Sequence, residues 1–219
     1  MSYETLIWEQ SDAVGRLTLN RPDRLNAWTA ELGRELGQVL GGEAADPSVR
    51  AVLLSGAGRG FSSGADLKEG FDAAEDGRPD VRKELHDVYH PAISRVRELE
   101  KPVVAAVHGA AVGKARAFQM ALLGERIPAP KALDWGLVNF VYPDEQLRDE
   151  AEALVARLAQ GPTRSYASSK KALNQMLFGD MQRQLDLEAE LQHELARSDD
   201  FTEGVAAFVE KREPSFQGA

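Results

Sequence analysis

Apolar and polar residues alternate in two short segments near the start of the chain, 5–10 and 14–20. This period of two predicts a β-hairpin whose turn covers residues 11–13. Arg21-Pro22-Asp23 follows directly and should end the second strand, because proline cannot donate to a strand ladder.

The period then changes. Apolar residues recur at helical spacing over 30–40, which predicts a helix with Thr29 as its N-cap and Gly41-Gly42 as its stop. The next run, 49–55, is continuously apolar, as is typical of a strand buried on both faces of a sheet. A glycine-rich loop over 56–64 comes after it.

A long amphipathic helix over 79–100 and a second buried strand over 102–107 complete the first half. The order strand, helix, strand, helix, strand predicts a layered α/β fold. Beyond Pro143 nearly every segment has helical periodicity. We therefore expect an α/β core over 1–143 and a helical C-terminal subdomain over 144–219.

The remaining elements expected from periodicity are one short strand over 137–141 and helices over 115–123, 129–135, 145–159, 163–177, 181–197 and 201–210.

Composition narrows the classes of function. The 219 residues include 26 Lys and Arg against 35 Asp and Glu, a net charge of −9, which disfavours general nucleic-acid binding. Cysteine is absent, which excludes disulfides and thiolate metal sites. No apolar run approaches the roughly 18 residues of a membrane helix, and the N-terminus does not resemble a secretion signal. We expect a cytoplasmic protein with no membrane partner.

The glycine-rich loop follows a buried strand, where α/β sheets place ligands. An ordinary connection also has this composition, and the spacing is not that of a phosphate-binding P-loop. Small residues also follow the strand over 102–107, at Gly109 and Gly113. Backbone N–H groups from Gly64-Ala65 and from this second turn could converge on one carbonyl oxygen and form an oxyanion hole.

The histidines do not define a site by themselves. His108 stands at a strand end, where a structural hydrogen bond is the favoured role. His86 and His90 share one helical face at i, i+4 spacing. A metal site would need a Glu beside the first histidine or a third ligand nearby, and the sequence offers neither. We therefore predict no metal site.

Several segments together resemble the enoyl-CoA hydratase/isomerase (crotonase) superfamily. In order, the similar segments are Asn20-Arg21-Pro22-Asp23-Arg24-Leu25-Asn26-Ala27, Phe61-Ser62-Ser63-Gly64-Ala65-Asp66-Leu67-Lys68, Lys101-Pro102-Val103-Val104-Ala105-Ala106-Val107-His108-Gly109, Trp135-Gly136-Leu137-Val138 and Gly204-Val205-Ala206-Ala207-Phe208-Val209-Glu210-Lys211-Arg212. The resemblance covers almost the whole chain.

The resemblance implies a spiral of ββα units with a helical C-terminal subdomain, assembled as a trimer or a dimer of trimers. It implies an acyl-CoA substrate, with coenzyme A as part of the substrate and no separate cofactor. The Ala65 N–H is the implied oxyanion donor. The residues implied to line the CoA site are Arg24, Ala27, Ser63, Asp66, Leu67 and Lys68.

The chain departs from the family after Gly113. Roughly forty residues of the family pattern are absent there, which leaves the chain short for one domain of this type. Gly113 is the candidate for the second oxyanion N–H. The two positions that carry paired glutamates in hydratases fall in the absent segment, so we assign no catalytic acid or base. We expect an omitted stretch or a cut chain, with numbered neighbours between Ala110 and Ala115 lying farther apart than about 3.8 Å.

Three functions remain open from the sequence. The leading one is an enoyl-CoA hydratase/isomerase-type enzyme acting through an enolate held by backbone N–H groups. The second is a non-catalytic crotonase-fold protein that binds acyl-CoA or a protein. The third is another reaction of the superfamily, such as thioester hydrolysis or decarboxylation.

Overall fold

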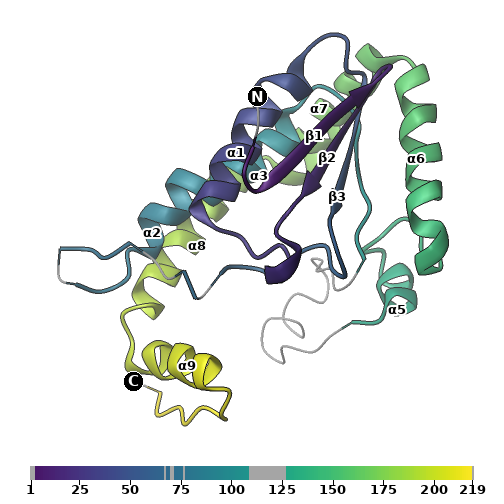
Figure 1. Ribbon diagram of the computed structural model, residues 1–219. Helices are drawn as coiled ribbons and strands as arrows, with labels where there is room; N and C mark the ends of the chain where they lie inside the picture. The colour runs from purple at the N-terminus through teal and green to yellow at the C-terminus, as the bar shows by residue number, and fades with distance from the viewer. Residues whose placement is uncertain (1–2, 67, 70–71, 76, 109–126, 219) are drawn as a thin grey trace.

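The computed structural model describes residues 3–66, 68–69, 72–75, 77–108 and 127–218. Figure 1 shows one mixed sheet with helices on both faces and a helical arm that leads to the C-terminus. The α/β class predicted from the sequence is confirmed. Leu67, Gly113, the helix expected over 115–123 and the expected break between Ala110 and Ala115 lie outside the described residues.

The sheet has the strand order β1-β2-β3-β4. The first pair is antiparallel and the other two pairs are parallel. The strands are β1 (Leu6–Ser11), β2 (Val14–Leu19), β3 (Ala51–Gly56) and β4 (Val103–Ala105). The predicted hairpin is confirmed, with Asp12 in the left-handed region at φ 53°. The last strand is shorter than predicted because only three residues of it pair with β3.

Helices α1 (Ala30–Gly41) and α3 (His90–Glu98) cover one face of the sheet (Figure 1). The Thr29 hydroxyl accepts the Leu32 N–H at 3.2 Å, which confirms the predicted N-cap. Alternate strand residues point to this face, as the period of two requires. Its fully buried side chains include Leu17, Leu19, Leu32, Val39, Val49 and Val52.

Helix α6 (Asp144–Gln160) covers the opposite face. Ala151, Val155 and Ala159 pack there against Ala51 and Leu53 of β3. An ion pair between Arg16 of β2 and Glu152, 2.8 Å long, holds the same helix at its side. The first helix after Pro143 is therefore packed directly on the sheet.

The long helix expected over 79–100 consists of three consecutive parts. These are α2 (Val81–Glu84), a π-helical turn η3 (Leu85–Tyr89) and α3. Asp80 begins the helix by accepting the Lys83 N–H at 3.0 Å. The π-turn packs on α1, where Gly33 lies so close to Val88 that an added Cβ would approach that side chain to 2.2 Å. The apolar pattern of the sequence did not predict this π-helical turn.

The other helices are α5 (Ala129–Asp134), α7 (Thr163–Phe178), α8 (Met181–Leu195) and α9 (Asp199–Glu210), with short 3₁₀ turns η1 (Pro22–Arg24) and η2 (Glu43–Ala45). The predicted strand over 137–141 is wrong: these residues form no regular structure. An apolar run becomes a strand only beside a partner, and none of the described strands pairs with it. In the described ranges, no helix has the length and apolarity that crossing a membrane requires.

Helix α7 is fastened to the end of α3 by a partly buried lysine. The Lys170 ammonium donates to the carbonyl oxygens of Val96 and Leu99, each at 2.8 Å, and of Lys101 at 3.2 Å. These carbonyls lie at or just beyond the C-terminus of α3, where helical acceptors need partners. Burial, and secondarily the charge of Arg97, lowers the pKa of Lys170 to about 8.

Candidate active site

The turn after β2 and the glycine-rich loop after β3 form one unit around Asn26. This side chain is fully buried. Its Oδ1 accepts the Arg21 N–H at 2.8 Å, and its Nδ2 donates to the Ala57 and Gly60 carbonyls at 2.9 and 2.8 Å. Asn26 also adopts φ 52°, a left-handed conformation that asparagine tolerates better than most residues. The turn therefore positions the loop directly.

An ion pair provides a second connection between the same segments. The Arg21 guanidinium lies 2.9 Å from the Asp66 carboxylate and also donates to the Ala27 carbonyl. Burial acts to raise the pKa of Asp66, but hydrogen bonds from Arg21 and from the Lys68 N–H outweigh it, so the pKa is lowered. Asp66 is thus an ionised anchor for the loop.

The backbone at Ala65 is held on both sides. Trp28 donates its N–H to the Gly64 carbonyl at 2.8 Å, and Asp66 donates its N–H to the Trp28 carbonyl at 2.8 Å. Ala65 itself is exposed, and its N–H makes no hydrogen bond to another described residue. Gly64 precedes it at φ 90°, a conformation that L side chains rarely adopt. The result is a fixed N–H group that is available to a ligand.

The other predicted residues lie around this loop. Ser63 donates its N–H to the Leu25 carbonyl at 3.0 Å, and Ala27 is buried. Arg24 and Lys68 are exposed, and within the described part of the chain neither side chain forms an ion pair. The structure therefore brings five of the predicted CoA-site residues into one region, while Leu67 lies outside the described residues.

His108, three residues beyond the end of β4, supports the loop. Its Nε2 lies 3.2 Å from the Gly58 carbonyl, and its own carbonyl accepts the Phe61 N–H at 3.0 Å. The structural role predicted for this histidine is confirmed by these contacts.

A cleft of about 380 Å³ opens beside Ala65. Trp28 and Tyr89 both line it, with their rings stacked at 5.5 Å between centroids. Glu84 lines it as well. Burial raises the pKa of Glu84, and the neighbouring charges of Asp72 and Glu69 raise it further. Glu84 was not predicted from the sequence as a site residue, because a glutamate on an amphipathic helix is normally solvated and no local pattern distinguishes one that lines a cleft.

A second, larger cleft of about 740 Å³ lies against the sheet, between α3 and α7. Its lining is mainly apolar and includes Leu54 of β3 and Val103 and Ala105 of β4. An open apolar surface of this size beside the central strands is unusual for an isolated α/β layer, whose parallel strands are normally covered. Trp28, whose backbone is hydrogen-bonded to the loop that carries Ala65, lines both clefts.

Comparison with known proteins identifies the family. A sequence model described as enoyl-CoA hydratase/isomerase matches residues 9–114 and 110–219. A 1,2-epoxyphenylacetyl-CoA isomerase of Escherichia coli is 33% identical over 98% of this chain and 99% of its own length. A probable enoyl-CoA hydratase of Rhodobacter capsulatus is 36% identical over the full length of both chains. The chain belongs to the enoyl-CoA hydratase/isomerase family.

Solved structures agree with this assignment. An enoyl-CoA hydratase from Mycobacterium avium subsp. paratuberculosis superposes with a TM-score of 0.84 at 32% identity, covering 99% of this chain and 100% of the other. An enoyl-CoA hydratase/isomerase from Pseudoalteromonas atlantica gives 0.83 at 28% identity, covering 98% and 100%. The crotonase fold predicted from the motifs is confirmed.

The comparisons also locate the departure from the family. The two matched ranges of the family model meet at residues 110–114. The alignment with the Rhodobacter protein runs over 262 positions, whereas this chain has 219 residues, so about forty positions face no residue here. The position of the missing segment was therefore predicted correctly from the sequence, a few residues beyond β4.

Proposed function

We propose that the protein acts on acyl-CoA thioesters as an enoyl-CoA hydratase or isomerase. The observation that carries the proposal is the exposed Ala65 N–H, which is fixed by hydrogen bonds on both sides and belongs to a loop that resembles the family's oxyanion loop. Family membership and the names of the relatives support the substrate class.

The chemistry follows from charge development on the thioester. Adding water at C3 or removing a proton at C4 of an enoyl thioester shifts an electron pair onto the thioester oxygen and gives an enolate. A preorganised N–H stabilises that oxygen more than the neutral carbonyl. In this proposal Ala65 donates to the oxygen, and Gly113 remains the candidate for the second donor.

Proton transfer needs a group whose pKa lies nearer neutrality than that of an ordinary carboxyl. Among the described residues that line the cleft beside Ala65, Glu84 has a raised pKa and stands on the helix facing the loop. We infer that Glu84 exchanges the proton in this chain. The cleft is otherwise rich in carboxylates, so the CoA phosphates are better placed on the side of Arg24 and Lys68.

The test follows loss of the enoyl absorbance when the purified protein is incubated with crotonyl-CoA. Ala65→Pro deletes the N–H and should lower turnover by about a hundredfold or more, whereas Ala65→Gly retains the N–H and is the matched control. Glu84→Gln should lower turnover without weakening binding. Full activity in a folded Ala65→Pro variant would remove Ala65 from the site.

A second function is favoured by one observation, the absence of about forty family positions shortly after His108, which contacts the active-site loop. A chain without them could bind acyl-CoA and not convert it. Calorimetry with crotonyl-CoA and with crotonic acid separates the cases. Thioester binding without turnover supports the non-catalytic protein, and equal affinity for thioester and free acid contradicts both functions.

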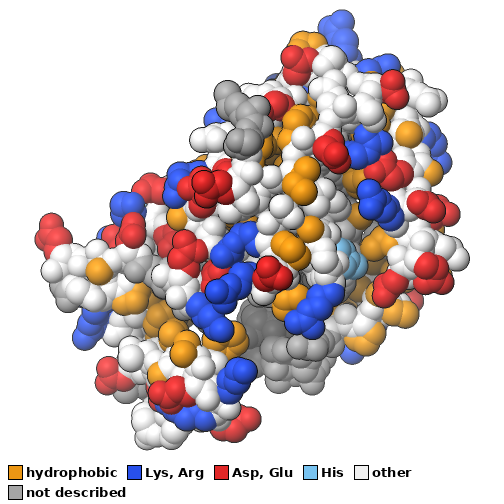
Figure 2. All heavy atoms as spheres, in the orientation of Figure 1, with side chains coloured by type: hydrophobic (Ala, Val, Ile, Leu, Met, Phe, Trp, Pro, Cys, Tyr) orange, Lys and Arg blue, Asp and Glu red, His pale blue; other side chains and the backbone are white. Residues whose placement is uncertain are grey.

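We also propose a homotrimer or a dimer of trimers in the cytoplasm. Exposed apolar side chains on the C-terminal helices support assembly, and some of them lie between charged groups over α8 and α9 in Figure 2. The exposed apolar side chains of helices α7, α8 and α9 include Leu173, Met176, Leu191, Leu195 and Phe208, each at least 49% exposed.

A further inference from the structure

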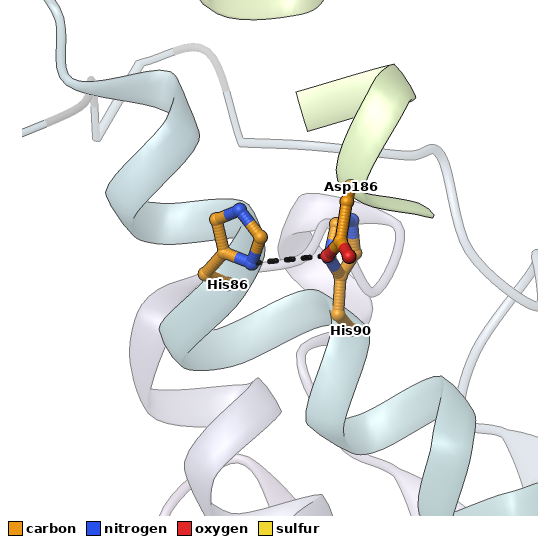
Figure 3. A group of neighbouring side chains, drawn as sticks. All are labelled: His86, His90 and Asp186. Carbon is orange, nitrogen blue, oxygen red and sulfur yellow. Dashed lines mark ion pairs between the residues drawn. The ribbon is translucent and has the colours of Figure 1, made fainter. Parts of the chain in front are cut away.

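Two histidines and an aspartate meet where the π-helical turn contacts α8. His86 belongs to the turn, His90 is the first residue of α3, and Asp186 comes from α8 (Figure 3). One ligand atom from each residue can be chosen so that all three lie within 4.8 Å of one another. The His86 Nδ1 is 3.8 Å from the Asp186 carboxylate, and the two imidazole rings lie edge to face at 5.2 Å.

The state of His90 points independently to a ligand. The residue is only 5% exposed, and its Nδ1 is buried with no hydrogen-bond partner among the described residues. Leaving a buried polar atom unpaired costs about 1–3 kcal/mol, so such atoms normally have a partner. A neutral imidazole binds a metal ion through such an unpaired ring nitrogen.

The surroundings favour a cation. The Asp186 carboxylate, 3.8 Å from the His86 Nδ1, carries a negative charge that attracts a cation. The basic groups near the cluster already have acidic partners: Arg82 pairs with Glu190, and Lys83 pairs with Asp87 and Asp72. Arg82 and Lys83 thus pair with carboxylates other than that of Asp186.

We propose that His86, His90 and Asp186 bind one transition-metal ion of the Zn²⁺, Ni²⁺ or Co²⁺ class. Two imidazoles and a carboxylate are a ligand set that such ions accept, and water can take the remaining position. Bond lengths of about 2.0–2.1 Å place tetrahedral ligands about 3.3–3.5 Å apart, so the ligands must draw together slightly. His86 and Asp186 can do so because their side chains are 38% and 51% exposed.

The consequence is a cross-link between α8 and the helix that borders the Ala65 cleft. Asp186 lies about a hundred residues beyond the histidines in the chain. The same helix presents Glu84 and Tyr89 to that cleft. Metal binding should therefore fasten the C-terminal helices to the α/β core and restrict motion of this wall.

The test uses the untagged full chain after treatment with a chelator, so that no added histidine tag binds metal. Zn²⁺ is titrated by calorimetry, and thermal unfolding is measured with Zn²⁺ or with Mg²⁺. We expect one Zn²⁺ per chain, a micromolar or lower dissociation constant, and a rise of the melting temperature by several degrees that Mg²⁺ does not reproduce. Bound Co²⁺ should show visible absorption typical of low coordination.

Variants at the exposed ligands make the test specific. His86→Ala and Asp186→Asn should each weaken Zn²⁺ binding at least tenfold and abolish the thermal shift. Glu190→Gln removes a neighbouring charge pair between the same helices and should retain both. The proposal is overturned if Zn²⁺ binding persists unchanged in His86→Ala. It is also overturned if the unaltered chain binds no Zn²⁺ at a concentration about 100 times a micromolar dissociation constant.

Discussion

Asn26 connects the turn after β2 to the active-site loop through three hydrogen bonds, and replacing it tests how far the loop depends on them. Asn26→Ala removes three hydrogen bonds, one from the Arg21 N–H and two to the carbonyls of Ala57 and Gly60. The side chain is fully buried, so water cannot easily replace the lost partners. The variant should destabilise the fold and release the loop that carries Ala65.

The expected magnitude comes from two terms. Each lost hydrogen bond contributes about 1 kcal/mol, so three contribute about 3 kcal/mol. Alanine also tolerates the left-handed conformation at this position less well than asparagine, which adds about 1 kcal/mol. The free energy of unfolding should fall by about 4 kcal/mol, a large fraction of the stability of an ordinary domain.

Urea unfolding followed by circular dichroism measures this change. Asn26→Gly separates the two terms, because glycine adopts positive φ freely and should lose about 1 kcal/mol less than alanine. Asn139→Ala is the matched control: that asparagine is exposed, makes no hydrogen bond to a described residue, and should change stability by less than about 0.5 kcal/mol. A loss below about 1 kcal/mol in Asn26→Ala would refute the reasoning.

Three further measurements test other parts of the fold. Gly56→Ala should destabilise by about 1–3 kcal/mol, because its Cβ would meet backbone oxygen at 2.7 Å, whereas Gly37→Ala has open space and should stabilise by about 1 kcal/mol; equal effects in thermal unfolding would contradict this. Sedimentation should show a trimer or hexamer, and Leu173→Glu with Met176→Glu should dissociate it; a monomer at micromolar concentration would count against assembly. The folded pKa of Lys170, about 8, lies below its ordinary 10.5, so the unfolded chain binds more protons between these values and stability contributed by this lysine rises with pH there. The difference in unfolding free energy between the unaltered protein and Lys170→Met should therefore increase as the pH rises through this range. A constant difference would contradict the lowered pKa of Lys170.

Local signals were sufficient for much of the first half of the chain. The hairpin, the N-cap at Thr29 and the strand Ala51–Gly56 each depend on a period, a cap or a turn residue within a few positions. The order of the motifs along the chain was sufficient to predict the family and the position of the missing segment after Gly113, because motif order is a property of the sequence alone.

Prediction from the sequence failed where the structure of a segment depends on the element that packs beside it. Residues 137–141 are apolar enough for a strand, yet no described strand lies beside them to accept their hydrogen bonds. The π-helical turn interrupts an unbroken amphipathic pattern at Val88, where the helix must fit against Gly33. Apolar spacing reports which face is buried and does not report what the face meets.

The sequence by itself thus determined the family, the layered α/β class and the loop that carries Ala65. Only the tertiary structure decided which distant groups meet: Arg21 with Asp66, Glu84 with the Ala65 cleft, and His86 and His90 with an aspartate of α8. The physical reason is that secondary structure follows from neighbours along the chain, whereas a site depends on side chains that approach only when the elements pack. A third ligand about a hundred residues away leaves no trace in the local pattern around the histidines.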